Sequence, residues 1–138
     1  MEINKFVGND FYLSNFYPCK INYLGVEFNS TEAAFQAAKC KNLQGFKSFS
    51  GLNPTEAKRK GRRISLRDDW EEVKLSVMKE ILILKFQDKE LKEKLLNTGN
   101  ATLIEGNNWN DCYWGVCNGI GENHLGKLLM EIRESMKI

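Results

Sequence analysis

The stretch DDWEEVKLSVMKEILILKF, residues 68–86, decides the fold, because it predicts one long amphipathic helix over 69–86. Its apolar residues recur three and four positions apart, the spacing that places side chains on one face of an α-helix. Asp68 is expected to cap the N-terminus of this helix. The face expected to lie in the core consists of Trp70, Val73, Val77, Ile81 and Leu84, widened by Leu75, Met78, Leu82 and Phe86.

Shorter elements are expected on the N-terminal side of this helix. Residues 19–23 and 26–28 are two short strand-like runs around a Leu-Gly turn, which predicts a β-hairpin. Ser30 is expected to cap an alanine-rich helix over 31–42. The run Asn-Pro-Thr-Glu that begins at Asn53 combines a capping side chain, proline at the first helical position and glutamate at the third, and predicts a short basic helix.

The C-terminal part of the chain predicts two more helices. Asp88 begins a helix that ends before Gly99, a short strand is expected at 103–104, and the Asn-, Asp- and Gly-rich residues 106–121 are expected to form a loop. The final helix carries one apolar face, made of Leu125, Leu128, Leu129, Ile132 and Met136. Together these elements predict an α+β fold, a single, predominantly helical domain over residues 1–138 with a small β-sheet.

Composition and charge limit the classes of function. The chain has 138 residues, of which 42% are hydrophobic and 28% charged, ordinary values for a soluble globular protein. Twenty Lys and Arg against 18 Asp and Glu give a net charge of +2, which argues against a protein that binds nucleic acid by a general positive charge. The sequence contains no bilayer-spanning apolar stretch and no signal-peptide core, so we expect a cytoplasmic protein without a membrane partner.

Cysteine and histidine are sparse and poorly spaced for metal binding. The four cysteines form no Cys-x-x-Cys pair, and the single histidine, His124, lies seven residues beyond Cys117. Free thiols in a reducing compartment are the favoured interpretation, and we expect no metal and no other cofactor. In an enzyme with one histidine, carboxylates and lysines are the better candidates for catalysis.

The alanine-rich helix carries a polar stripe. Glu32, Gln36 and Lys39 are spaced i, i+4 and i+7, which places a carboxylate, an amide and an amine on one face. The surrounding alanines let other backbones approach closely, so the stripe suggests a pocket wall. The alternative is an exposed polar face on which Glu32 complements the helix dipole.

Two further segments combine aromatic and charged residues in a way that fits neither a simple core element nor a simple exposed surface. In residues 107–115, aromatic side chains stand beside Asp111 and could stack on a planar ring, although they could equally pin the loop to the core. In residues 62–70, an arginine cluster that includes Arg67 precedes Trp70 and could pair with phosphate oxygens. The alternative there is a solvated basic surface next to a core tryptophan.

These segments together resemble one known family. FYLSNFYPCKI, STEAAFQAAKC, NPTEAKRKGRRI, LRDDWEEVKLSVMKEILILKF, LLNTGNATLIE and NDCYWGVCNGIGENHLGKLLMEIR, in this order, resemble the NADAR family, also called YbiA-like, over residues 11–136. The resemblance implies an N-glycosidase. Some members hydrolyse the bond between ribose and a base-like amine in early riboflavin-pathway intermediates, and others remove ADP-ribose from modified guanine bases in nucleic acid.

The resemblance also implies site residues. The family's acidic residue falls on Glu32 and its lysine on Lys39, and Asp111 supplies a second carboxylate, so these three are the expected catalytic residues. The sequence departs from the family motif where Ala33 and Ala34 follow Glu32, at positions commonly held by His and Tyr. The residues expected to bind substrate are Asn15, Phe16, Gln36, Arg67, Trp70, Trp114, Gly115 and Asn123.

The implied reaction suits these residue types. Cleavage of a C1′–N bond develops oxocarbenium character, which a carboxylate such as Glu32 can stabilise or attack with an activated water. Lys39 could instead attack C1′ of the opened sugar, provided that its pKa is lowered. The expected partner is a small-molecule ribosyl-phosphate or ADP-ribosyl substrate, possibly on a modified nucleic-acid base, with no obligate protein partner. The alternatives are a non-catalytic ADP-ribose or nucleotide-binding module and a protein-interaction role.

Overall fold

The long helix is α4, Trp70–Lys85, in a computed structural model that describes residues 1–137. The buried face of α4 is rotated about the helix axis relative to the expected face. Leu75 and Leu84 are 37% and 39% exposed, whereas Lys85 is only 2% exposed. At 100° per residue, Lys85 lies nearer than Leu84 to the middle of the buried face. The buried residues of α4 are Trp70, Val77, Met78, Ile81, Leu82 and Lys85.

The start of α4 also differs from the expectation. The N-cap residue is Asp69 rather than Asp68, and the Asp69 side chain makes no capping hydrogen bond within the described chain. Its two carboxylate oxygens instead accept hydrogen bonds of 2.6 and 3.1 Å from the Arg67 side chain. This bidentate pair takes the group that would otherwise cap the helix.

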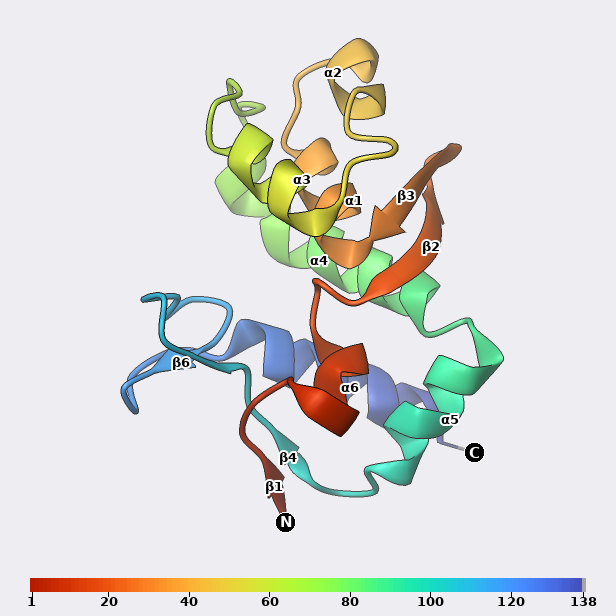
Figure 1. Cartoon of the computed structure of the whole chain (residues 1–138), viewed down its shortest axis with the longest axis vertical. Coiled ribbons are helices and arrows are strands. Elements are labelled where there is room, and N and C mark those ends of the chain that lie inside the picture. The colour runs from red at the N-terminus through yellow and green to blue at the C-terminus, as the bar shows by residue number, and fades with distance from the viewer. Residues whose placement is uncertain (138) are drawn as a thin grey trace. The chain divides into compact units, whose positions relative to one another are not determined.

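The chain divides into two compact units, and one of them consists of residues 15–87. It holds α4 and an antiparallel hairpin of β2, Pro18–Tyr23, and β3, Val26–Ser30 (Figure 1). Leu24 and Gly25 form its turn with φ values of 52° and 83°, so the predicted hairpin is confirmed.

Helix α1, Thr31–Ala38, follows β3 without a connecting loop. The Ser30 hydroxyl accepts a 3.1 Å hydrogen bond from the Ala33 backbone N–H, which confirms the predicted cap. The helix ends four residues before the expected position, because the chain turns and Asn42 caps a short helix, α2, Leu43–Lys47, that the pattern did not predict. All eight residues of α1 are buried.

Helix α3, Pro54–Gly61, packs against α1, and α4 packs against both α1 and β2. The predicted start of α3 is confirmed as a capping box. The Asn53 side chain accepts from the Glu56 N–H at 2.8 Å, and the Glu56 carboxylate accepts from the Asn53 N–H at 2.9 Å. Together, β3, α3 and α4 surround α1.

The second unit joins residues 1–14 to residues 88–137. Its elements are β1 (Glu2–Ile3), the 3₁₀ helix η1 (Gly8–Leu13), α5 (Lys89–Asn97), β4 (Thr102–Leu103), β5 (Gly106–Asn107), β6 (Val116–Cys117) and α6 (His124–Met136). β1 pairs with β4 and β5 with β6, both in parallel, and α6 packs against β4 and α5. The predicted α5 cap is confirmed, because Asp88 accepts a 2.9 Å hydrogen bond from the Leu91 N–H.

The observed elements confirm the predicted α+β class, with helices dominating and strands confined to small two-stranded sheets. The organisation of residues 1–138 as one domain stays a prediction. Within residues 1–137, none of the helices combines the length and the apolar character needed to cross a lipid bilayer.

Candidate active site

The carboxylate of Glu32 is buried inside the unit formed by residues 15–87. Glu32 is 8% exposed and Gln36 is 6% exposed. Across one turn of α1, the Gln36 side-chain amide donates a 2.6 Å hydrogen bond to Oε2 of Glu32. Because both side chains are buried, the alternative of an exposed polar face on α1 is wrong. The hydrogen bond from Gln36 offsets the loss of hydration of the buried carboxylate.

Lys39 follows these two residues at the C-terminal end of α1. Its Nζ lies 5.8 Å from the centre of the Phe35 ring, and the Phe35 ring in turn contacts Trp70 with 5.1 Å between ring centres. The amine therefore lies over one ring of a buried aromatic pair.

The environment of Lys39 lowers the pKa of its amine. Burial is the largest cause, and the positive charges of Arg62, Lys58 and Lys74 act in the same direction, whereas the negative charge of Glu32 opposes them. Desolvation and like charges both favour the neutral amine, which is the nucleophilic form. Lys39 and Arg62 are the residues that directly follow α1 and α3, Lys58 lies in α3, and Lys74 lies in α4.

Asn15 and Phe16 lie beside the same site. The backbone carbonyl of Asn15 accepts a 3.0 Å hydrogen bond from the Glu32 N–H, and its side-chain amide lies 3.8 Å from the Met78 sulfur. The Lys58 Nζ lies 5.6 Å from the centre of the Phe16 ring. The structure thus brings Asn15 to the N-terminal end of α1 and Phe16 to Lys58 of α3.

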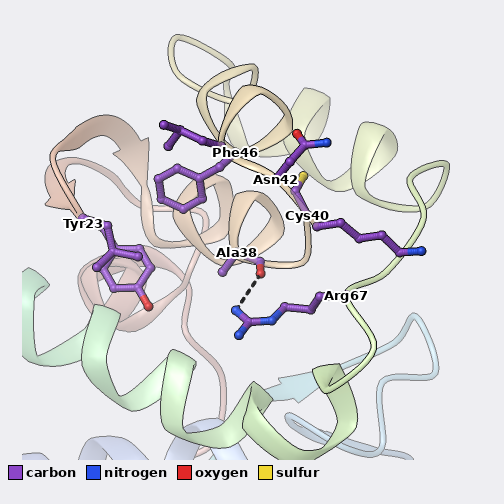
Figure 2. A pocket seen from close by; sticks show the side chains of 9 residues that line it. Tyr23, Ala38, Cys40, Asn42, Phe46 and Arg67 are labelled. Atoms are coloured by element: carbon purple, nitrogen blue, oxygen red, sulfur yellow. Dashed lines mark hydrogen bonds between the residues drawn. The ribbon is translucent and has the colours of Figure 1, made fainter.

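Arg67 is placed by the backbone at the other end of α1. Its N–H donates a 2.9 Å hydrogen bond to the Lys39 carbonyl, and its side chain reaches the Ala38 carbonyl at 3.5 Å. Figure 2 shows the Arg67 guanidinium pointing at that carbonyl across a pocket from Tyr23. The pocket has a volume of about 250 Å³ and is lined by none of Glu32, Gln36 and Lys39.

Trp70 occupies a core position. It is 5% exposed and packs against Phe35, which agrees with its place at the start of the buried face of α4. Little of its ring is accessible to a ligand in this arrangement, and its part in base binding stays a prediction.

The remaining predicted residues lie in the other unit, in the loop before α6. Oδ1 of Asp111 accepts hydrogen bonds from the N–H groups of Tyr113 and Trp114, at 3.2 and 2.9 Å. The Trp114 carbonyl then accepts a 2.9 Å hydrogen bond from the Leu125 N–H. Asp111 therefore shapes the loop that carries Trp114, and this contact ties the loop to the first turn of α6.

Gly115 and Asn123 are joined within that loop. The Asn123 N–H donates to the Gly115 carbonyl at 3.2 Å. A side chain at position 115 would collide with the backbone and carboxylate of Glu105, so only glycine fits there. The Asn123 side chain accepts from the Glu105 N–H at 3.0 Å and donates to the Leu103 carbonyl at 2.9 Å, which places both residues in the framework of the loop.

Within residues 1–137, the four cysteines are free thiols, and no three His, Cys, Asp or Glu side chains gather in an arrangement that could hold a metal ion.

Comparison with known proteins decides the family. Residues 5–137 match the model of the NADAR domain. The chain belongs to the NADAR family. It is 41% identical over 143 residues to N-glycosidase YbiA of Shigella boydii, covering 99% of this chain and 89% of that protein. The NMR structure of the Escherichia coli protein YbiA superposes with a TM-score of 0.87 at 36% identity, covering 99% of this chain and 83% of the other.

A second kind of NADAR relative is longer. A riboflavin biosynthesis protein of Vibrio vulnificus is 34% identical over 134 residues, which cover 94% of this chain but 36% of that protein. The family resemblance inferred from the sequence motifs is therefore confirmed. The roles of the individual site residues stay predictions.

Sequence reasoning missed the cations around Lys39. Lys58 and Arg62 were assigned to a basic helix and an arginine cluster without a link to Lys39, and Lys74 was not singled out. The i, i+4 spacing of Lys58 and Arg62 is the signal that places them on one face of α3. Which neighbour that face would meet depended on the packing of α3 against α1.

Proposed function

We propose that this chain is a metal-independent N-glycosidase that hydrolyses a ribose–nitrogen bond, either in an ADP-ribosylated base or in a phosphoribosylamino intermediate of riboflavin synthesis. Support comes from its membership of the NADAR family and from relatives named as N-glycosidases and as a riboflavin biosynthesis protein. The observation that carries the proposal is the buried Glu32 carboxylate, held by Gln36 on the helix face that also bears Lys39.

The carboxylate suits the charge that develops in this reaction. As the C1′–N bond breaks, positive charge accumulates on the sugar, and a fixed anion nearby stabilises it. Burial strengthens that interaction because little water screens it. In the proposal, Glu32 either stabilises the sugar cation directly or removes a proton from the water that attacks C1′.

Lys39 has two proposed roles, and its lowered pKa bears on both. In the covalent role, the neutral amine adds to C1′ of the opened sugar, the base leaves with a proton, and water then hydrolyses the Schiff base to release the sugar and restore the amine. In the electrostatic role, the protonated amine pairs with a substrate phosphate and water alone attacks.

The cations near Lys39 favour an anionic substrate. Lys58, Arg62 and Lys74 act on the Lys39 amine together, and the phosphate or diphosphate of a ribosyl-phosphate or ADP-ribosyl compound would complement their charge. Asn15, Phe16, Gln36, Arg67, Trp70, Trp114, Gly115 and Asn123 are proposed to bind or frame the substrate, and Asp111 to supply a second carboxylate.

One experiment separates the substrate classes. The protein is incubated with ADP-ribosylated guanosine or DNA and, separately, with phosphoribosylamino pyrimidine intermediates, with and without exhaustive chelation. Released base and sugar phosphate are measured by chromatography. Turnover of one class that persists after chelation and is lost in Glu32→Gln supports the proposal. Tight binding of ADP-ribose without any turnover would support a binding module instead.

A further inference from the structure

Gly61, the last residue of α3, lies against the side chain of Gln36. A Cβ atom built on Gly61 would overlap the Gln36 Oε1 and lie 2.7 Å from Cδ and 3.3 Å from Cβ of the same side chain. These are the three nearest atoms, and all of them belong to Gln36. The space kept open by this glycine is therefore filled by one carboxamide.

The backbone conformation of Gly61 does not explain the choice of glycine. Six other glycines have positive φ values, where glycine is favoured, but Gly61 is not among them. Gly61 is helical, and glycine is a poor helix former compared with alanine. The requirement at this position is for space.

The chemistry of Gln36 fixes which end of its amide meets the glycine. The Gln36 amide nitrogen lies 2.6 Å from Oε2 of Glu32, which suits a carboxylate because that group only accepts hydrogen bonds. Oε1 then faces Gly61 and has no hydrogen-bond partner within residues 1–137. The hydrogen on the Gly61 Cα that a side chain would replace points at this oxygen, a weak C–H···O arrangement.

We propose that Gly61 is a positioning residue for the candidate active site. Its bare Cα leaves the space in which the Gln36 carboxamide lies, and that carboxamide holds the Glu32 carboxylate in place. A side chain at position 61 would push the amide away from its present rotamer and release the carboxylate. The consequence for catalysis rests on the proposed function, whereas the arrangement of the three residues does not.

The first test needs no substrate. In ¹⁵N-labelled protein, the side-chain amide resonances of Gln36 should move as the Glu32 carboxyl group titrates, because the two groups are hydrogen-bonded. Gly61→Ala should abolish that pH-dependent movement. The matched control is Gly45→Ala, a helical glycine in α2 whose nearest neighbours are Cys40 and Asn42, and it should leave the Gln36 signals unchanged. Retention of the titration shift in Gly61→Ala would overturn the proposal.

The second test is a double-mutant cycle on activity. Gly61→Ala and Gln36→Met, which keeps the bulk but lacks the donor, should each lower kcat by about ten- to a hundredfold, the scale of a lost hydrogen bond to a charged group. The fall in kcat should exceed any rise in KM. In a Gln36→Ala background, which removes the carboxamide, Gly61→Ala should have almost no further effect. Additive losses would contradict the proposal.

The pH profile and the folding of the variants complete the test. A carboxylate that loses a donated hydrogen bond takes up a proton at higher pH, so the acid side of the activity profile should move upward in Gly61→Ala. Lys39, whose amine interacts with the charge of Glu32, and the cations that act on Lys39 in turn, Lys58, Arg62 and Lys74, are the same in all variants. If Gly61→Ala alone fails to fold, the double variant with Gln36→Ala should fold, and its failure would overturn the proposal. Loss of the resonance shift without measurable turnover on any substrate would support the positioning and count against the proposed function.

Discussion

The side chains of Glu32 and Gln36 are joined by a 2.6 Å hydrogen bond inside the protein, one turn apart on α1. The carboxylate is therefore oriented by the protein itself before a substrate arrives. Preorganised charge of this kind is the most effective way for a protein to stabilise a developing cation, because no reorganisation is needed during the reaction.

Replacing Glu32 with Gln should lower kcat by about a hundred- to ten-thousandfold, the usual scale of a lost acid–base group. The side chain keeps its size, so the melting temperature should remain close to that of the wild type. Glu27→Gln, a change of the same kind at an exposed position of β3, serves as the control and should retain full activity. Turnover of Glu32→Gln within a few-fold of the wild type would exclude a catalytic Glu32.

The role of Lys39 can be read from pH dependence and trapping. Its pKa is lowered chiefly by burial, so the neutral amine is available at lower pH than in an ordinary lysine. A covalent role predicts that activity rises with pH as the amine loses its proton, and that borohydride during turnover leaves a sugar adduct on Lys39, detected by mass spectrometry. If no adduct forms and Lys39→Arg keeps substantial activity, the role is electrostatic.

Trp70 and Trp114 should respond differently to truncation. Trp70 is 5% exposed against Phe35, so Trp70→Ala should lower the free energy of unfolding by about 3–5 kcal/mol. Trp114 is half-buried in the loop before α6, and Trp114→Ala should cost less stability while raising KM. Chemical denaturation and steady-state kinetics on both variants check this. Unchanged affinity and turnover in Trp114→Ala would remove that residue from the substrate site.

Asp111 offers a way to separate loop structure from catalysis. Its Oδ1 accepts two backbone hydrogen bonds, from Tyr113 and Trp114, and an asparagine oxygen can accept the same two. Asp111→Asn should therefore preserve the loop, whereas Asp111→Ala should disorder it, as near-UV circular dichroism of its aromatic residues would report. A catalytic carboxylate predicts that both variants lose activity. Full activity of Asp111→Asn would leave Asp111 with a structural role.

The buried Lys85 should give the protein an unusual dependence of stability on pH. Burial lowers the pKa of Lys85 from 10.5 to about 8, so the folded state binds fewer protons than the unfolded state between these values. Stability contributed by this residue therefore rises as the pH increases from about 8 to 10.5. Below pH 8 the protonated form should cost about 3 kcal/mol, the equivalent of the difference between the two pKa values.

Lys85→Met checks this prediction, because methionine fills a similar volume without a charge. The variant should be more stable than the wild type at pH 7, and the difference should shrink as the pH approaches 10. Urea denaturation at several pH values measures it. A constant difference across that range would show that Lys85 does not change its protonation there.

The parts of the fold that follow local rules were predictable. The hairpin and the Asn53 capping box depend on neighbouring residues alone, and both are confirmed. Helix α2 was not predicted because its cap, Asn42, was assigned as the last residue of the expected helix over 31–42. The burial of Lys85 could not be predicted from the sequence either, because it depends on how α4 packs and not on the hydrophobicity of the residue.

In the candidate site, too, the local arrangement was predictable and the tertiary contacts were not. Spacing alone placed Glu32, Gln36 and Lys39 on one face of a helix. It did not reveal that α3 supplies Lys58 and Arg62 to the surroundings of Lys39, because that contact joins residues about twenty positions apart.

The complete enclosure of α1 has a consequence for how substrate choice could diverge. Every residue of this helix is buried, so any substitution along Thr31–Ala38 changes the interior and must be accommodated by neighbouring elements at the same time. Ala33 and Ala34 cannot be enlarged one at a time without such adjustment, because both are fully buried. New specificities should therefore arise more readily through the loops, where single changes are tolerated, than through the helix that carries the candidate residues Glu32 and Gln36.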